Sequence, residues 1–115
     1  MTEVASLMCD GLLNIYPFSD IRGIEIAEGD IMYITEAQNL SVDLMKLAIQ
    51  RCAEGSKIII EGDPFTQVDK EAFQGESNGL KRLIEVFVGD EEINFSYVHL
   101  KNIYRSKIAE KAERM

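Results

Sequence analysis

Apolar residues occur along the chain in short groups separated by polar turns, and their spacing predicts alternating strands and helices. Residues 31–34 and 58–60 are apolar runs that follow turn residues, which is typical of strands buried on both faces of a sheet. Residues 93–99 alternate between apolar and polar positions and predict a third strand. Residues 13–18 could form either a strand or an extended link, and Pro17 restricts a strand there to the edge of a sheet.

Between these strands the apolar residues recur with helical spacing. Ser41 is a good helix N-cap, and the helix that it begins is expected to end at Gly55. Further helices are predicted over residues 3–13, 80–87 and 103–115. Strands that alternate with helices require crossover connections, so we expect an α/β fold with a mostly parallel sheet and flanking helices.

Length and composition predict a single domain over residues 1–115, of which 46% are hydrophobic. No apolar run approaches the roughly 20 residues that span a bilayer, and the amino terminus lacks the features of a signal peptide. We therefore expect a cytoplasmic protein with no membrane partner. Cys9, Cys52 and His99 are too few to supply the four ligands of a structural zinc site.

The net charge of −8 is unevenly distributed along the chain. Residues 1–100 contain 18 acidic and 7 basic side chains, whereas residues 101–115 contain five basic and two acidic ones. The acidic majority would repel the backbone of RNA or DNA. The basic end could still contact a phosphate, or it could simply form a solvated helix face.

Polar side chains follow the first two predicted strands: Thr35, Glu36 and Gln38 after one, and Asp63 and Gln67 after the other. Because the carboxyl ends of parallel strands share one edge of a sheet, binding sites gather there. A carboxylate at that edge can polarise a water molecule, and an amide can hold the water or contact a phosphate oxygen. The same residue types would also serve as ordinary solvated or capping residues in a strand-to-helix loop.

Five segments, all in the same order, resemble the motifs of the PhoH-like P-loop ATPases, a family related to superfamily-one helicases. They are I-R-G at 21–23, I-M-Y-I-T-E-A-Q-N-L at 31–40, G-D-P-F-T-Q-V-D at 62–69, S-N-G-L at 77–80 and Y-R-S-K-I-A at 104–109. The second is similar to the Walker B strand and D-E-A-Q-N motif of that family. The resemblance implies the carboxy-terminal half of a PhoH-like ATPase core, with a three- to four-stranded sheet from a partial P-loop NTPase (RecA-like) fold.

The resemblance also implies roles in ATP hydrolysis for four side chains. Glu36 would be the general base or the carboxylate that positions the attacking water. Gln38 and Gln67 would sense the γ-phosphate and couple it to bound RNA or DNA. Arg105 would reach a phosphate, in its own subunit or as an arginine finger toward a neighbour, unless it only forms a surface salt bridge.

Two further residues, Asp63 and Arg22, would belong to the nucleotide-binding side, where Asp63 orients the site through hydrogen bonds. Thr35 and Glu36 would face Mg²⁺. Thr35 stands where the family has the Walker B aspartate, and its hydroxyl supplies no charge, so weakened metal binding is expected. Gln67 is preceded by one residue more than the family spacing, which can displace it.

The chain contains no G-x-x-x-x-G-K-[ST] loop, the Walker A motif. Without that loop, no backbone N–H groups and no lysine cradle the β- and γ-phosphates, so the chain is not expected to hydrolyse ATP alone. In the implied fold, the strand leading into the loop would lie between residues 58–61 and 93–98. We expect a partner segment to fill that gap, the two strands to close up, or the chain to form a homo-oligomer.

Two functions therefore remain open. The first is a half-domain of a PhoH-like ATPase that acts on nucleic acid and is completed by a missing Walker A half. The second is a non-catalytic binding or assembly module derived from that fold, which Thr35 and the missing loop favour. A small regulator of the response-regulator kind fits less well, because it would need an acidic pair on its first strand and a late lysine.

Overall fold

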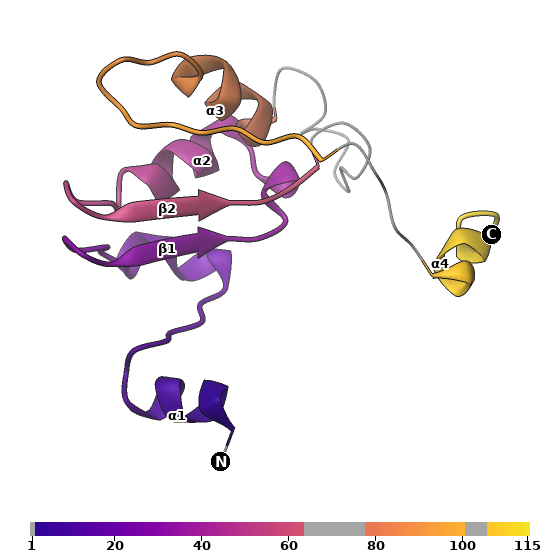
Figure 1. Cartoon of the computed structure of the whole chain (residues 1–115), viewed down its shortest axis with the longest axis horizontal. Helices are drawn as coiled ribbons and strands as arrows, with labels where there is room; N and C mark the ends of the chain where they lie inside the picture. The colour runs from indigo at the N-terminus through magenta and orange to yellow at the C-terminus, as the bar shows by residue number, and fades with distance from the viewer. Residues whose placement is uncertain (1, 64–77, 101–105) are drawn as a thin grey trace.

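The computed structural model describes residues 2–63, 78–100 and 106–115, and Figure 1 shows the order of their helices and strands. The elements are α1 (Glu3–Cys9), the 3₁₀ helix η1 (Phe18–Gly23), β1 (Ile31–Ile34), the 3₁₀ helix η2 (Ala37–Asn39), α2 (Val42–Ile49), β2 (Lys57–Ile60), α3 (Gly79–Phe87) and α4 (Lys107–Ala112).

The sheet in the described part of the chain consists of β1 and β2, which run parallel. Their register places Ile31 opposite Lys57 and Ile34 opposite Ile60. Parallel strands need a crossover between them, and α2 lies in that connection (Figure 1). The predicted α/β class with parallel pairing and flanking helices is confirmed.

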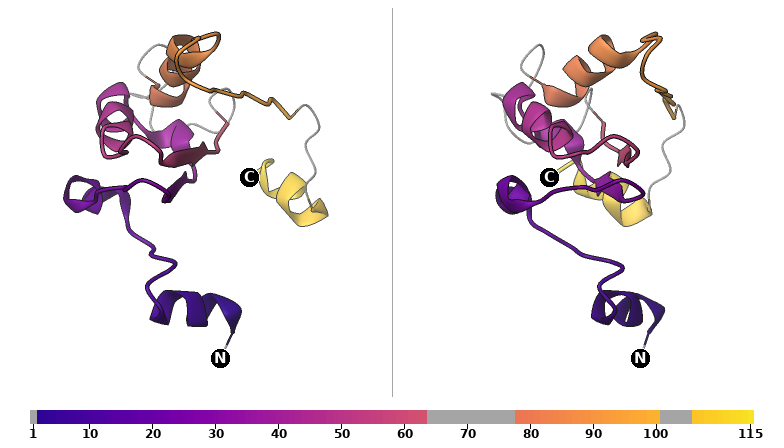
Figure 2. Two further views of the ribbon diagram at one scale, coloured as in Figure 1. Left: turned by 60° about the vertical axis from the view of Figure 1, so that its left-hand side comes forward. Right: turned by 90° about the vertical axis from the view of Figure 1, so that its left-hand side faces the viewer.

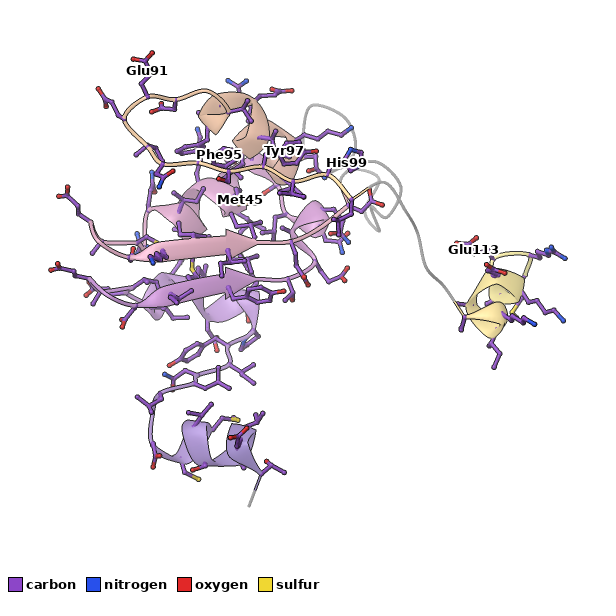
Figure 3. The ribbon with its side chains drawn as sticks, viewed as in Figure 1. Met45, Glu91, Phe95, Tyr97, His99 and Glu113 are labelled. Atoms are coloured by element: carbon purple, nitrogen blue, oxygen red, sulfur yellow. The ribbon has the colours of Figure 1, made fainter. Side chains whose placement is uncertain are left out.

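One face of the sheet carries the core. Met32 and Ile34 point into it from β1, and Ile58 and Ile60 of β2 are partly buried on the same side, as the period of two along a strand requires. Met45 of α2, labelled in Figure 3, is only 3% exposed and belongs to the same cluster. The buried residues that complete the core come from η1, η2, the residue that follows η2, α2 and α3: Ile21, Ala37, Leu40, Ala48 and Leu80.

The other face of the sheet is open. Ile31, Tyr33 and Ile59 are 60%, 54% and 51% exposed, although parallel sheets are usually covered on both faces. Helices α1 and α4 contain no buried residue and stand away from the sheet (Figures 1 and 2). The radius of gyration is 16.3 Å, whereas a compact domain of this length would have about 13 Å. The described residues therefore form a one-sided sheet, which is a sheet with a core on one face only, and the two terminal helices add to its extent without covering the other face.

Helix α2 begins as predicted but ends earlier. The Ser41 hydroxyl accepts a hydrogen bond from the backbone N–H of Leu44 at 3.2 Å. The prediction that this helix extends to Gly55 is wrong, because residues 51–53 bond to Ile26 instead. The N–H of Ile26 donates to the carbonyl of residue 51 at 2.9 Å, and the N–H of residue 53 donates to the carbonyl of Ile26 at 2.8 Å. Gly55, with φ +83°, lies in the turn before β2.

The third strand predicted over residues 93–99 is not formed, since residues 93–100 belong to no helix or strand. Figure 3 labels Phe95, Tyr97 and His99 along this segment. Phe95 stacks on Phe87 of α3 with ring centroids 6.0 Å apart, and Tyr97 stacks on His99 at 6.5 Å. A strand also needs a neighbour for its backbone bonds, and β2 pairs only with β1 among the described residues. Among the described residues, residues 93–98 therefore do not pair with β2, which was one of the three ways in which the gap between them was expected to be filled.

The terminal helices are shorter than predicted. The chain reverses after α1 at Gly11, φ +72°, where the N–H groups of Leu12 and Leu13 bond to the carbonyl of Leu7 at 2.9 and 3.2 Å. Residues 13–17 form a link and not a strand. Ile108 of α4 is 83% exposed, and residues 103–105 of the predicted helix lie outside the described residues. No helix of the described ranges has both the length and the apolar character needed to cross a bilayer.

We predict that the same substitution has different effects on the stability of the fold at two neighbouring isoleucines of β2. Ile59→Thr should change the free energy of unfolding by no more than about 0.5 kcal/mol and reduce self-association, because Ile59 lies on the open face. Ile58→Thr should destabilise by about 1–3 kcal/mol, because Ile58 packs against the core. Urea denaturation and light scattering measure the two effects. Equal destabilisation by both changes would contradict the one-sided sheet.

Candidate functional site

The loops that follow β1 and β2 meet at the carboxyl edge of the sheet. The N–H of Glu61 donates to the carbonyl of Ile34, and the N–H of Ala37 donates to the carbonyl of Glu61, both at 3.0 Å. These bonds continue the ladder beyond the strands, so that the Thr35–Glu36 turn lies beside the start of the next loop. Of the polar residues that the sequence placed after the two strands, the structure brings Glu36, Gln38 and Asp63 together at this edge.

Glu36 has a strained backbone. It is the one described non-glycine residue with positive φ, at φ 54° and ψ 37°, and it directly precedes η2. A left-handed conformation costs an L-residue about 1–2 kcal/mol. Such strain is retained where the surrounding structure imposes it, and it clusters at functional sites. The exposed side chain of Glu36 leaves its carboxylate accessible to a ligand.

Gln38 lies directly behind Glu36 and is 1% exposed. Its Nε2 donates to Oε2 of Glu36 at 2.7 Å, and its Oε1 accepts from the backbone N–H of Asp63 at 3.2 Å. The NH₂ group and the oxygen of this amide therefore both form hydrogen bonds within the protein. The loops after β1 and β2 are joined through one side chain.

Asn78 secures the same region from the side of α3. It is 0% exposed, and its Nδ2 donates to the carbonyl of Gln38 at 2.7 Å. Its Oδ1 caps α3 by accepting from the N–H groups of Leu80 and Lys81 at 3.0 and 3.1 Å. The sequence indicated Asn78 only as part of a motif match. An asparagine directly before a glycine and an apolar helix was the available signal for a cap.

Two glycines allow this close packing. A Cβ at Gly62 would lie 2.6 Å from Oε1 of Gln38 and 2.9 Å from a methyl group of Leu80. A Cβ at Gly79 would overlap the carbonyl oxygen of Ser41. Gly62 approaches the buried amide of Gln38, and Gly79 approaches the backbone of Ser41, so closely that no side chain fits at either position without displacement.

The other predicted site residues are only partly brought together. Thr35 is exposed beside Glu36, and Asp63 is half-buried at the start of the next loop. Arg22 lies in η1 and lines a shallow hollow with Asn39. No described contact links Arg22 to Glu36. Gln67 and Arg105 lie outside the described residues.

The donor set for Mg²⁺ is small. The described ranges contain no group of three or more His, Cys, Asp or Glu residues that could hold a metal ion. Thr35 and Glu36 offer one neutral and one charged oxygen. Such a pair fits a Mg²⁺ ion that keeps several waters and contacts substrate phosphates, and it does not form a closed protein cage.

Tyr33 and Glu61 form a polar contact on the open face of the sheet. The Tyr33 hydroxyl donates to Oε2 of Glu61 at 2.6 Å. This hydrogen bond raises the pKa of Tyr33, with smaller contributions from desolvation and from the charge of Glu61. The carboxylate therefore favours the protonated phenol.

The parallel α/β sheet, with an acid and buried amides at its strand ends, is compatible with part of a P-loop NTPase-like core. A family model described as PhoH-like protein matches residues 1–115, and the chain belongs to that family. The resemblance drawn from the sequence motifs is confirmed at the level of the family.

Three relatives indicate the extent of the similarity. Protein PhoH2 of Bacillus subtilis is 38% identical over 79 residues, which are 69% of this chain and 17% of that protein. Protein PhoH of Escherichia coli K12 is 30% identical over 101 residues, 88% of this chain and 27% of that protein. A PhoH-like protein of Mycobacterium tuberculosis is 26% identical over 105 residues, 91% of this chain and 29% of that protein. No solved structure gives a significant match. The chain thus spans less than a third of the length of each of these relatives.

We predict that Glu36→Gly is more stable than Glu36→Ala by about 1 kcal/mol in urea denaturation. Both changes remove the carboxylate, but only glycine adopts φ near 54° without cost. Glu85, exposed in helix α3, provides the matched control. In that helix Glu85→Gly should be less stable than Glu85→Ala by about 1 kcal/mol, because glycine has the lower helix propensity. The same ranking at both positions would show that the backbone of Glu36 is not strained.

A second prediction concerns the pKa of Tyr33. Glu61→Gln should lower it, because the carboxylate that favours the protonated phenol is removed. Since the pKa of Tyr33 is higher in the folded chain than its ordinary value of about 10, this contact stabilises the fold below about pH 10. That contribution is lost as the pH rises through the folded pKa. An NMR titration of ¹³C-labelled tyrosine measures the shift, with Glu85→Gln as the control that leaves it unchanged.

Proposed function

We propose that this chain forms the hydrolysis side of a PhoH-like ATPase core and acts with a Walker A loop carried on another segment or subunit. The observation that carries the proposal is the convergence of Glu36, Gln38 and Asp63 at the carboxyl edge of β1 and β2. In open α/β sheets this edge is where phosphate-containing ligands bind. An exposed carboxylate held from behind by an amide is suited to orient an attacking water.

The open sheet supports a partner in this proposal. The described part of β2 has a pairing partner only on the β1 side, and residues 94–98 belong to no ladder among the described residues. A strand placed between them would satisfy both sets of backbone groups and lead into the phosphate-binding loop. The partner is then either the segment that carries Walker A or a further subunit of a homo-oligomer.

ATP and Mg²⁺ are the cofactors of the proposed assembly. Thr35 and Glu36 would face the metal, and Asp63 would help to arrange the nucleotide side. The bound ion would supply positive charge to the phosphate oxygens. RNA or DNA remains a proposed substrate, which the exposed basic side chains of α4, Lys107 and Lys111, support by their charge.

The alternative proposal is a binding or assembly module that has kept the fold without hydrolysis. Thr35 favours it, since Mg²⁺ sites usually include one or two carboxylates and this position supplies a hydroxyl. In that case the partner would still occupy the open edge of β2, but no turnover would follow.

The proposal is tested by titration calorimetry with ATP, with and without Mg²⁺, on the chain alone and on the chain co-expressed with a Walker A segment from its own genome. We expect no saturable binding by the chain alone, because it lacks the phosphate-binding loop. The co-expressed pair should bind and hydrolyse ATP. Glu36→Gln should retain binding and reduce kcat by about 100-fold or more.

Glu85→Gln, which changes an acid on the surface of α3, is the control and should leave hydrolysis unchanged. Tight ATP binding by the chain alone would contradict the proposed division between two segments. A pair that assembles but hydrolyses ATP only after Thr35→Asp would favour the non-catalytic module.

A further inference from the structure

We propose that Gln38 is a positioning residue for Glu36 and that Asn78 in turn fixes Gln38. This inference rests on the proposed function, in which the Glu36 carboxylate orients the attacking water. It differs from the role that the family resemblance implied for Gln38, a direct contact with the γ-phosphate.

The contacts of Gln38 allow only one orientation of its amide. Nε2 faces the carboxylate of Glu36 and Oε1 faces the N–H of Asp63. Turning the amide over would place its oxygen against the carboxylate and its NH₂ group against the N–H. Two attractive contacts would become two repulsive ones. The orientation is therefore determined by the protein itself.

The amide also has no room to move. Gln38 is 1% exposed. The backbone of Gly62 packs so closely against its side-chain oxygen that a Cβ added at Gly62 would lie only 2.6 Å from that oxygen. Its backbone carbonyl is held by Asn78 at 2.7 Å, and the Asn78 side chain is tied to the start of α3. A direct bond from Gln38 to a phosphate would require it to give up a buried partner, at a cost of about 1–3 kcal/mol.

The hydrogen bond to Gln38 restrains the side chain of the strained residue. The two residues are two positions apart, and the bond from Nε2 closes a ring that runs through the Cα–C bond of Glu36 and the backbone of residue 37. Loss of that bond removes a contact that opposes relaxation to an ordinary conformation. A shift of the loop at Asp63 would reach Glu36 through the same amide.

The test uses NMR of the full chain and Gln38→Met, which keeps the length of the side chain but removes the amide. Positive φ shortens the distance between the amide proton and Hα of one residue, so residue 36 should give a strong intraresidue cross-peak in the wild type. In Gln38→Met that cross-peak should fall to the level of extended residues, with the remaining spectrum still folded. Gln50→Met, the same change at an exposed site, should leave it strong. A strong cross-peak in folded Gln38→Met would overturn the proposal.

Glu36→Gly tests the same hydrogen bond by removing its acceptor instead of its donor. Glycine also keeps the left-handed backbone at low cost. Hydrogen exchange of the Gln38 side-chain amide should become about ten-fold faster, since its acceptor is gone. Exchange of the Asn78 side-chain amide should not change, because that group bonds to the carbonyl of Gln38. Unchanged exchange at Gln38 would also overturn the proposal, even if Gln38→Met did not fold.

Neither measurement involves nucleotide. Failure to bind ATP in the co-expressed pair would refute the proposed function and leave the link between Gln38 and Glu36 to be decided by NMR. In the active pair, Gln38→Met should lower kcat and leave KM for ATP nearly unchanged, because Gln38 acts through Glu36. A rise in KM alone would instead indicate that Gln38 contacts the nucleotide.

Discussion

Hydrogen bonding of two buried side-chain amides determines how the strand-end loops are arranged. Gln38 and Asn78 are the largest fully buried side chains among the described residues. A buried amide without partners costs about 1–3 kcal/mol, so each of them must find donors and acceptors in the surrounding loops. The partners they find come from the ends of both strands and from the first turn of α3. Three elements that are distant in sequence are thereby held in one arrangement.

The parts of the fold that depend on local signals could be predicted from the sequence. The strands at 31–34 and 57–60 and the cap at Ser41 follow from apolar runs and from side-chain chemistry within a few residues. The end of α2 could not be predicted, because it depends on pairing of residues 51–53 with Ile26 far away in the chain. The same reason explains the strand that did not form at 93–99: alternation describes one segment, whereas a ladder needs two.

The candidate site shows a similar division. Glu36 and Asp63 were predicted at one edge of the sheet because parallel strands end on the same side. The burial of Gln38 was not predicted, since polar residues after a strand normally face solvent. The left-handed backbone of Glu36 was also unforeseen, because the sequence has no glycine there to indicate positive φ. The burial of Gln38 goes with the close approach of Gly62 to its side-chain oxygen and of Asn78 to its backbone carbonyl, which are contacts distant in sequence.

The strained residue and the open sheet indicate a division of labour in the proposed assembly. The orientation of Glu36 depends on groups within this chain, so it is established before any partner arrives. Cation and phosphate contacts are different, since the described residues of this edge offer the Glu36 carboxylate, the Thr35 hydroxyl and a half-buried Asp63, and no group of three or more potential metal ligands. A carboxylate that is arranged in advance loses little freedom when the reaction begins, which is the condition under which electrostatic and general-base contributions are largest. The partner would then have to supply the phosphate cradle and the cover for the open sheet, but not the geometry of the base.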